Sequence, residues 1–164
     1  MEQANWFIIP IAGLLPLILG YIWYHPNVLG TKLAQINGAP IEGKRSIGRV
    51  ALIYLFGILL AYVLTLMSIH QVAIYQLFFM DPDLSNSNSE YNLYINEFME
   101  KYGNRHRSFI HGVVHGTEAG LIFSLALIGI TTLLQNEPLK KVWIHIGFCI
   151  LCCSLMAGLT CAFF

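Results

Sequence analysis

The sequence predicts an all-α polytopic membrane protein: a four-transmembrane-helix bundle with a short amphipathic helix in the outer loop between helices 2 and 3. Three observations support this fold class. First, 56% of the 164 residues are hydrophobic and only 11% are charged, whereas a soluble domain carries about 25% charged residues. Second, four apolar segments are long enough for a membrane span, which requires about 20 residues. Third, backbone groups in hydrocarbon must be bonded within their own segment, which requires helices.

The chain is expected to form one transmembrane domain over residues 1–164. Its predicted spans are residues 5–25, 50–70 with an apolar extension to 80, 109–134 and 142–163. Pro10 and Pro16 are expected to bend the first helix, because each removes a backbone donor. No Lys or Arg precedes the first apolar run and no A-x-A-like cleavage site follows it, so a retained anchor is expected. The extension to residue 80 is expected to project outward and meet the amphipathic helix.

The long polar stretch, residues 81–107, is predicted to contain the amphipathic helix. Its apolar residues recur at helical spacing and form one face: Tyr91, Tyr94, Ile95, Phe98, Met99 and Tyr102. Ser87 and Glu90 have the spacing of a capping box, and Gly103 supplies a stop, so the helix is expected at about 88–102. It is expected to lie on the outer membrane surface, or else to cover the bundle as a lid.

Basic residues near the span ends predict the orientation. The loops after the first and third spans carry Lys32, Lys44, Arg45, Arg49, Lys140 and Lys141. With four spans these loops share one side, which the positive-inside rule assigns to the cytoplasm, although the opposite loop holds the competing residues Lys101, Arg105 and Arg107. We therefore expect a multi-pass protein of a bacterial inner membrane with both termini on the outer side. The net charge is zero, so no nucleic-acid partner is expected, and the basic residues are too scattered along the chain to predict a lipid-headgroup patch.

The third span carries a stripe of glycines on one face. Gly112, Gly116 and Gly120 are spaced by four residues. Small residues at this spacing let another helix backbone approach closely, so the three glycines are predicted to be helix-packing residues. Weaker stripes of small residues on the first span (Ala12, Pro16, Gly20) and on the fourth (Ser154, Gly158) make both spans candidate partners. Because a bundle this small buries a narrow interior, the alternative is that the stripe serves a second copy of the chain or another membrane protein.

A second face of the same span carries ionisable groups. His111, His115 and Glu118 fall within about 60° of one another on a helix. This spacing could hold a transition metal such as zinc, copper or iron. The second span runs antiparallel and brings His70 to the same outer level, and His106 could add a further ligand. The alternative is that these histidines only form hydrogen bonds between helices.

Glu118 is the only charged residue inside a predicted span. A carboxylate inside a transmembrane helix costs about 2.5–3.5 kcal/mol on insertion scales, so we expect Glu118 to face the bundle interior with a partner. Three roles are considered. In the first, Glu118 is protonated and hydrogen-bonded to Tyr62, Thr65 or Ser68 of the second span. In the second, it pairs with a neighbouring histidine as a metal or proton site. In the third, it lines a water-filled solute path.

The sequence gives less support to haem binding and to catalysis. A b-type haem would need two facing histidines, such as His70 with His111 or His115, or His25 with His145. No further haem signature accompanies them. The cysteines of the fourth span are interpreted as small packing residues. The sequence contains no G-x-S-x-G, P-loop or H-E-x-x-H motif, and no catalytic residue is predicted.

Three segments resemble the bacterial membrane family called domain of unknown function 1761. The first is LGYIWYHPNVLGTKLAQINGAP, residues 19–40, with a W-Y-x-P motif at Trp23, Tyr24 and Pro26. The second is FIHGVVHGTEAGLIFSLALIGITTLL, with its HG-x-x-HG form, and the third is the last span. The resemblance implies a four-helix integral membrane protein of bacterial origin. It implies no activity and no functional residue, and the long insert at 81–107 departs from the commoner members.

Two functions are therefore expected. The first is that of a helix-packing, accessory or oligomeric membrane protein without catalytic activity. The alternative is a small metal- or proton-handling transporter or sensor that uses His111, His115 and Glu118, together with His70.

Overall fold

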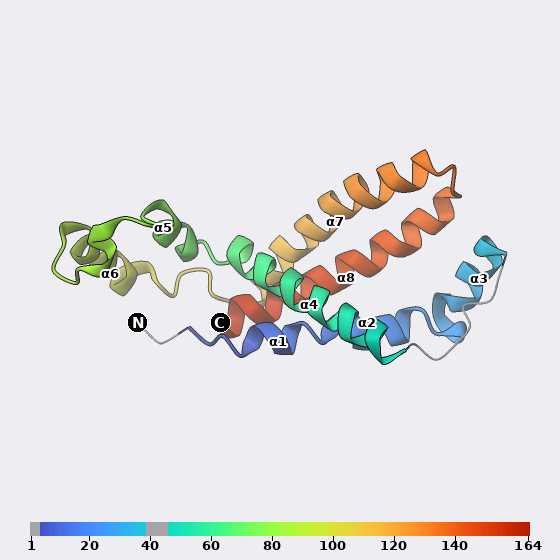
Figure 1. Cartoon of the computed structure of the whole chain (residues 1–164), viewed down its shortest axis with the longest axis horizontal. Helices are drawn as coiled ribbons and strands as arrows, with labels where there is room; N and C mark the ends of the chain where they lie inside the picture. Colours follow the sequence, from blue (N-terminus) through green and yellow to red (C-terminus); the bar gives the residue numbers. More distant parts are fainter. Residues whose placement is uncertain (1–3, 39–45) are drawn as a thin grey trace.

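The computed structural model describes residues 4–38 and 46–164, and within these ranges the chain is helical and contains no strand (Figure 1). Lys44 and Arg45, used in the orientation prediction, lie outside the described residues. The elements in chain order are α1 (Ile8–Ala12), α2 (Leu15–Trp23), η1 (Pro26–Gly30), α3 (Thr31–Asn37), α4 (Ile47–Ser68), α5 (Gln71–Leu77), η2 (Pro82–Ser85), α6 (Glu90–Tyr102), α7 (Phe109–Leu134) and α8 (Leu139–Phe163). The predicted all-α class is confirmed.

Three helices, α4, α7 and α8, are each long and apolar enough to cross a membrane. The N-terminal helices form a fourth apolar segment, which bends by 56° between Trp23 and Pro26. His25 is extended there (φ −65°, ψ 141°), because the residue before a proline avoids helical geometry. The break between α1 and α2 lies at residues 13–14, between the two prolines expected to bend this helix.

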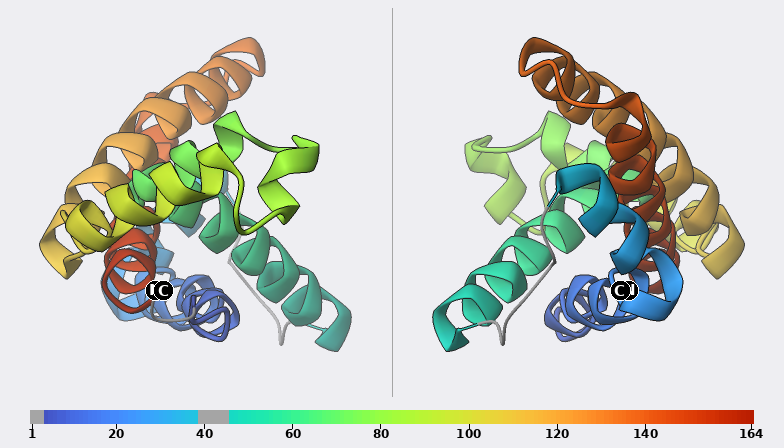
Figure 2. Two further views of the ribbon diagram at one scale, coloured as in Figure 1. Left: turned by 90° about the vertical axis from the view of Figure 1, so that its left-hand side faces the viewer. Right: turned by 90° about the vertical axis from the view of Figure 1, so that its right-hand side faces the viewer.

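The two ends of the described chain meet at one end of the molecule. The Asn5 backbone N–H donates to the carbonyl of Phe164 at 2.9 Å, and the Trp6 and Phe164 rings pack edge to face 4.9 Å apart. Figure 2 places the two termini together in both views. A membrane protein whose termini share one side crosses the bilayer an even number of times, so this contact favours counting α1–α2 as the fourth span.

The α7 and α8 helices form a close hairpin at the glycine stripe. A Cβ added at Gly112 or Gly116 would overlap the carbonyl of Ala157 or of Cys153, and one at Gly120 would lie 2.8 Å from Ile150 Cα. The three glycines are therefore helix-packing positions within the chain itself. The α8 helix, one of the two expected partner helices, occupies this face. An oligomer or a partner protein stays a prediction.

The α4 helix crosses the N-terminal helices at a second pair of glycines. A Cβ at Gly57 would overlap the carbonyl of Gly13, and one at Gly13 would lie 2.9 Å from Ile58. From this crossing α4 and α7 diverge, as Figure 2 shows. The buried core gathers around the middle of α8, where Met156 and Ala157 have no exposed surface. The bundle is consequently open between α4 and α7.

The helices α5 and α6 project beyond the bundle on the side where the termini meet (Figure 1). The apolar face of α6 buries Ile95 and Met99, and the Phe78 ring packs on that of Tyr91 at 5.1 Å. The chain after α4 thus projects and meets α6, as expected. The cap differs from the prediction: Ser89, not Ser87, accepts from the backbone N–H of Asn92 at 3.3 Å, because the turn η2 precedes it.

Candidate metal centre

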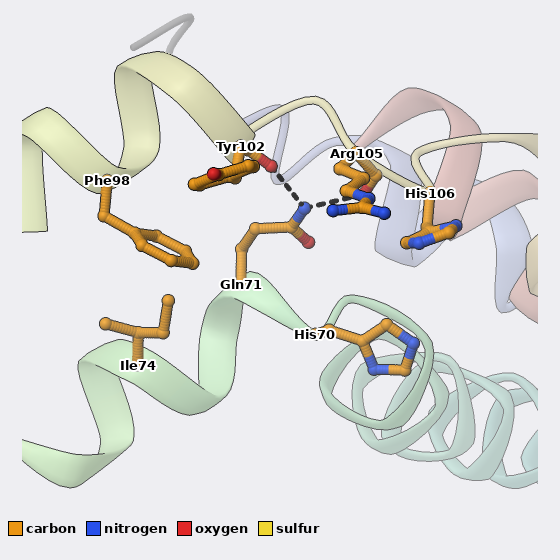
Figure 3. Close-up of a pocket in the computed structure, with 7 residues that line it drawn as sticks. All are labelled: His70, Gln71, Ile74, Phe98, Tyr102, Arg105 and His106. Carbon is orange, nitrogen blue, oxygen red and sulfur yellow. Dashed lines mark hydrogen bonds between the residues drawn. The ribbon is translucent and has the colours of Figure 1, made fainter.

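His70 owes its position to a break at the end of α4. Ile69 leaves helical geometry (φ −104°, ψ 95°), and the chain then restarts as α5 with His70 at its N-cap. The predicted span and its projecting extension are therefore two separate helices, α4 and α5. The break lets the His70 imidazole face the first turns of α7 instead of continuing around the α4 surface, and the side chain lies at the α4–α5 junction in Figure 3.

His111 and His115 come from one face of α7, one turn apart. Ser108 caps this helix by accepting from the His111 backbone N–H at 3.3 Å. The two imidazole rings meet edge to face with centroids 4.6 Å apart. Both side chains are half-buried, since the glycine stripe draws α7 onto α8 and leaves the histidine face directed toward the α4–α5 junction.

The three imidazoles converge. His111 Nε2 lies 3.1 Å from His70 Nε2, and the His70 and His115 rings are 5.0 Å apart. One ring nitrogen from each of the three lies within 4.8 Å of the other two. Zinc–imidazole bonds of about 2.0–2.1 Å at tetrahedral angles place ligand nitrogens about 3.3 Å apart. The closest pair is already near this spacing, at 3.1 Å, and no two of these nitrogens lie more than 4.8 Å apart. We name His70, His111 and His115 the histidine trio.

A fourth imidazole lies against the trio. The His106 ring stacks on His111 at 5.1 Å with an interplanar angle of 27°, and lies 6.4 Å from His70. Its backbone has φ +63°, a left-handed conformation that costs of order 1–3 kcal/mol for a residue other than glycine. The Cys161 thiol donates to the His106 carbonyl at 3.5 Å, and Arg107 Nε donates to the Cys161 carbonyl at 3.1 Å. The end of α8 thus holds this histidine in place.

A pocket of about 360 Å³ opens beside His70 and His106 (Figure 3). Its remaining lining residues are Gln71, Ile74, Phe98, Tyr102 and Arg105. Gln71 Nε2 donates to the carbonyls of Tyr102 at 3.1 Å and Arg105 at 2.7 Å. This one amide ties the segment between α6 and α7 to α5, and residues of both segments line the pocket.

A comparison with family models decides the relationship that the W-Y-x-P and HG-x-x-HG segments indicated. The model described as "Protein of unknown function (DUF1761)" matches residues 8–161. The chain belongs to the DUF1761 family. No curated protein and no solved structure gives a significant match. The matched range of this DUF1761 chain runs from the start of α1 to within three residues of the chain end, and it includes the whole histidine trio.

Glu118 occupies a different position in this DUF1761 protein from the one expected. Its side chain is 64% exposed, so the expectation that it faces the bundle interior is wrong. Glu118 lies two residues from both Gly116 and Gly120, which face α8, and this spacing turns Glu118 away from α8. The hydrogen bond to the second span is also absent among the described residues; Thr65 instead donates to the Ala61 carbonyl at 2.7 Å.

The carboxylate still borders the trio. Glu118 Oε2 lies 4.0 Å from His115 Nδ1, and the two residues share a pocket of about 210 Å³ with Met67, Ala119, Ile122 and Phe123. Three of the four predicted metal ligands are thus brought together directly, and Glu118 lies next to them on the membrane side. A change of side-chain rotamer is needed before Glu118 contributes a ligand.

The haem alternative does not fit the described side chains of this family member. On the trio side, the His70 and His111 rings are in direct contact, with centroids 5.1 Å apart, which leaves no room for a porphyrin between them. At the other end, His145 Nδ1 pairs with the Tyr24 hydroxyl at 3.0 Å, and His25 Nδ1 accepts from the Asn27 backbone N–H at 3.3 Å.

Two further residues that support the site, Cys161 and Gln71, were not predicted from the sequence. Cys161 was expected to be a packing residue without a loop partner, but it anchors the backbone of His106. Gln71, which holds the α6–α7 segment, carried no sequence signal beyond its place after His70. Both act through hydrogen bonds to backbone carbonyls more than 30 residues away in the sequence, and helical periodicity does not encode such contacts.

Proposed function

We propose that this DUF1761 protein is an integral membrane protein that binds one transition-metal ion through His70, His111 and His115. The observation that carries the proposal is the convergence of one nitrogen from each imidazole within 4.8 Å. These side chains come from two helices separated by about 40 residues, and the trio forms only where α4 breaks. Three convergent neutral imidazoles suit zinc, copper or iron(II) better than magnesium or calcium, which prefer oxygen ligands.

The trio leaves at least one coordination position open. A structural zinc site is closed by four protein ligands, whereas an open position admits water or an exchanging ligand. His106 and Glu118 are the two side chains placed to approach from opposite sides. A site of this kind suits capture, sensing or transfer of a metal ion. It supports the metal-handling alternative from the sequence over a purely structural role.

We further propose that the protein lies in a bacterial inner membrane with the trio and both termini on the outer side. The basic residues Lys32, Arg49, Lys140 and Lys141 lie at the ends of helices away from the trio, which supports this orientation under the positive-inside rule. The pocket beside His70 then opens to the outer side, where it receives metal ions from outside the cell.

The competing function is that of an accessory, oligomeric protein whose histidines only tie helices together. The 3.1 Å separation of His111 Nε2 and His70 Nε2 is also a hydrogen-bond distance when one ring donates and the other accepts. The exposed Glu118 favours a covering partner as well, because a carboxylate facing lipid is costly. A second copy packed over the α4–α7 opening would cover it.

Metal titration of the purified protein separates the two functions. The protein in detergent is stripped with chelator and titrated with Zn²⁺ by calorimetry, and bound metal is counted by elemental analysis. We expect one ion per chain, lost in His111→Gln and in His115→Gln. His25→Asn is the matched control, because it removes a histidine at the other end and keeps a cap acceptor for Asn27. Absence of stoichiometric zinc, copper and iron from the wild-type protein would refute the metal function.

A further inference from the structure

A third pocket lies between α3 and the start of α8, two elements at the end of the molecule opposite to α5 and α6 (Figure 1). Its volume is about 570 Å³. The lining residues are Leu29, Lys32, Gln35, Ile36, Lys140, Trp143 and Ile144. Lysines that stand far apart in the sequence therefore share one cavity, although the sequence alone predicted no basic patch.

Within the described ranges, residues 4–38 and 46–164, the pocket is lined by two lysines and by no acidic residue. Among the described residues, neither Lys32 nor Lys140 has a carboxylate within ion-pair distance. The adjacent Lys141 differs, because its Nζ lies 3.0 Å from Glu137 Oε1. The first turn of α8 contains no acidic residue, and Pro138 at its N-cap provides no side-chain cap. The unsatisfied amides and the dipole of α8 therefore add to the positive potential of the two lysines.

The rest of the lining is apolar and lies at the end of the spans. Leu29, Ile36 and Ile144 contribute aliphatic surface, and the Trp143 indole is 61% exposed. The Trp23 indole N–H donates to the Ile144 carbonyl at 3.1 Å, which ties the end of α2 to α8 at this level. The segment Pro26–Asn37 bends by 56° from the α1–α2 axis here, and tryptophan is a residue type enriched at the boundary between the membrane core and the headgroups.

We propose that this pocket binds the phosphate headgroup of an anionic phospholipid. Lys32 and Lys140 contact the phosphate from α3 and from α8, and the start of the acyl chains lies along Trp143 and Ile144. A cavity with paired cations over an apolar floor at the membrane boundary matches the headgroup and chain of such a lipid. The ligand also joins α3 to α8 and so stabilises the bend after α2.

Native mass spectrometry of the detergent-purified protein with phosphatidylglycerol or phosphatidylcholine tests the proposal. We expect selective retention of phosphatidylglycerol, and a drop in its affinity of about fivefold for each of Lys32→Gln and Lys140→Gln. Lys141→Gln is the matched control, because this lysine carries the same charge one residue away but is paired with Glu137. Its affinity for phosphatidylglycerol should stay within twofold of wild type.

Three results would overturn the proposal. One is equal retention of the two lipids. Another is a loss in Lys141→Gln as large as in Lys140→Gln, which would indicate diffuse attraction to a basic end. The third is displacement of the lipid by millimolar inorganic phosphate, which would indicate a soluble anion as the ligand. Retained helicity by circular dichroism and an unchanged elution volume would show that each variant is folded.

Discussion

His111 Nε2 lies 3.1 Å from His70 Nε2, across the gap between the first turn of α7 and the break that ends α4. The two residues are 41 positions apart, and each depends on a different local feature of the chain. Ser108 starts α7 so that His111 falls on its first turn, and the loss of helical geometry at Ile69 turns His70 toward it. The metal proposal therefore depends on two helix termini, and the first predictions concern this pair.

Replacement of His70 by glutamine should remove a ligand without removing a helix. Loss of a side chain that only supports a metal ligand lowers metal affinity about 10–100-fold, and we expect the loss of His70 to lower zinc affinity by more than that. His106→Gln should cost less, because its ring stacks on His111 outside the trio. Calorimetric titration of both variants measures the order. Equal losses for His70 and His106 would mean that the trio is wrongly assigned.

Acid should release the metal. Imidazole binds metal in its neutral form, and its ordinary pKa is about 6.5, so protons compete with the ion as the pH falls. Zinc affinity should be highest above about pH 7 and should decline steeply toward about pH 5. The thermal stabilisation that zinc gives should vanish over the same range, as measured by Tm with and without zinc at each pH. A zinc effect that persists unchanged at pH 5 would point to carboxylate ligands instead.

The glycine stripe should tolerate no added methyl group where α8 approaches. Gly112→Ala and Gly116→Ala place a Cβ against the carbonyls of Ala157 and Cys153, and overpacking of this kind costs about 1–3 kcal/mol. Tm in detergent should fall by several degrees. Gly129→Ala is the control on the same helix, since a Cβ there meets nothing within 4 Å. It should be neutral or stabilising by about 0.5–1 kcal/mol.

Removal of the Gln71 amide should loosen the segment between α6 and α7. Gln71→Ala loses both bonds, to the carbonyls of Tyr102 and Arg105, and each is worth about 0.5–1.5 kcal/mol. We expect amide hydrogen exchange over residues 103–108 to rise about tenfold, with α7 and α8 unchanged. If exchange rises equally throughout the chain, Gln71 stabilises the whole fold and not this segment.

Features that depend on local chemistry were predictable from the sequence. The lengths and apolar composition of α4, α7 and α8 determine their helical state, and the periodicity from Tyr91 to Tyr102 correctly placed α6. The approach of His70 to the two α7 histidines was also predictable, because antiparallel spans bring together residues that lie at the same depth in the membrane. These inferences need only helix geometry and the thickness of a bilayer.

The exposure of Glu118 and the pocket between α3 and α8 were not predictable, because they depend on the arrangement of the helices in space. A helical wheel showed that Glu118 and the glycine stripe point in different directions. It did not show that α8, and not the first span, fills the glycine side, or that α4 diverges from α7. Glu118 therefore ended exposed when an interior position was expected. Lys32 and Lys140 likewise share a pocket only because α3 folds back beside α8.

X-ray absorption at the zinc edge of the zinc-loaded protein tests the central claim most directly, because it reports the atoms bound to the ion. The account predicts a first shell of nitrogen and oxygen at about 2.0–2.1 Å with the multiple scattering of three imidazoles, reduced to two in His70→Gln. A sulfur shell at about 2.3 Å, or fewer than two imidazoles in the wild-type protein, would contradict it.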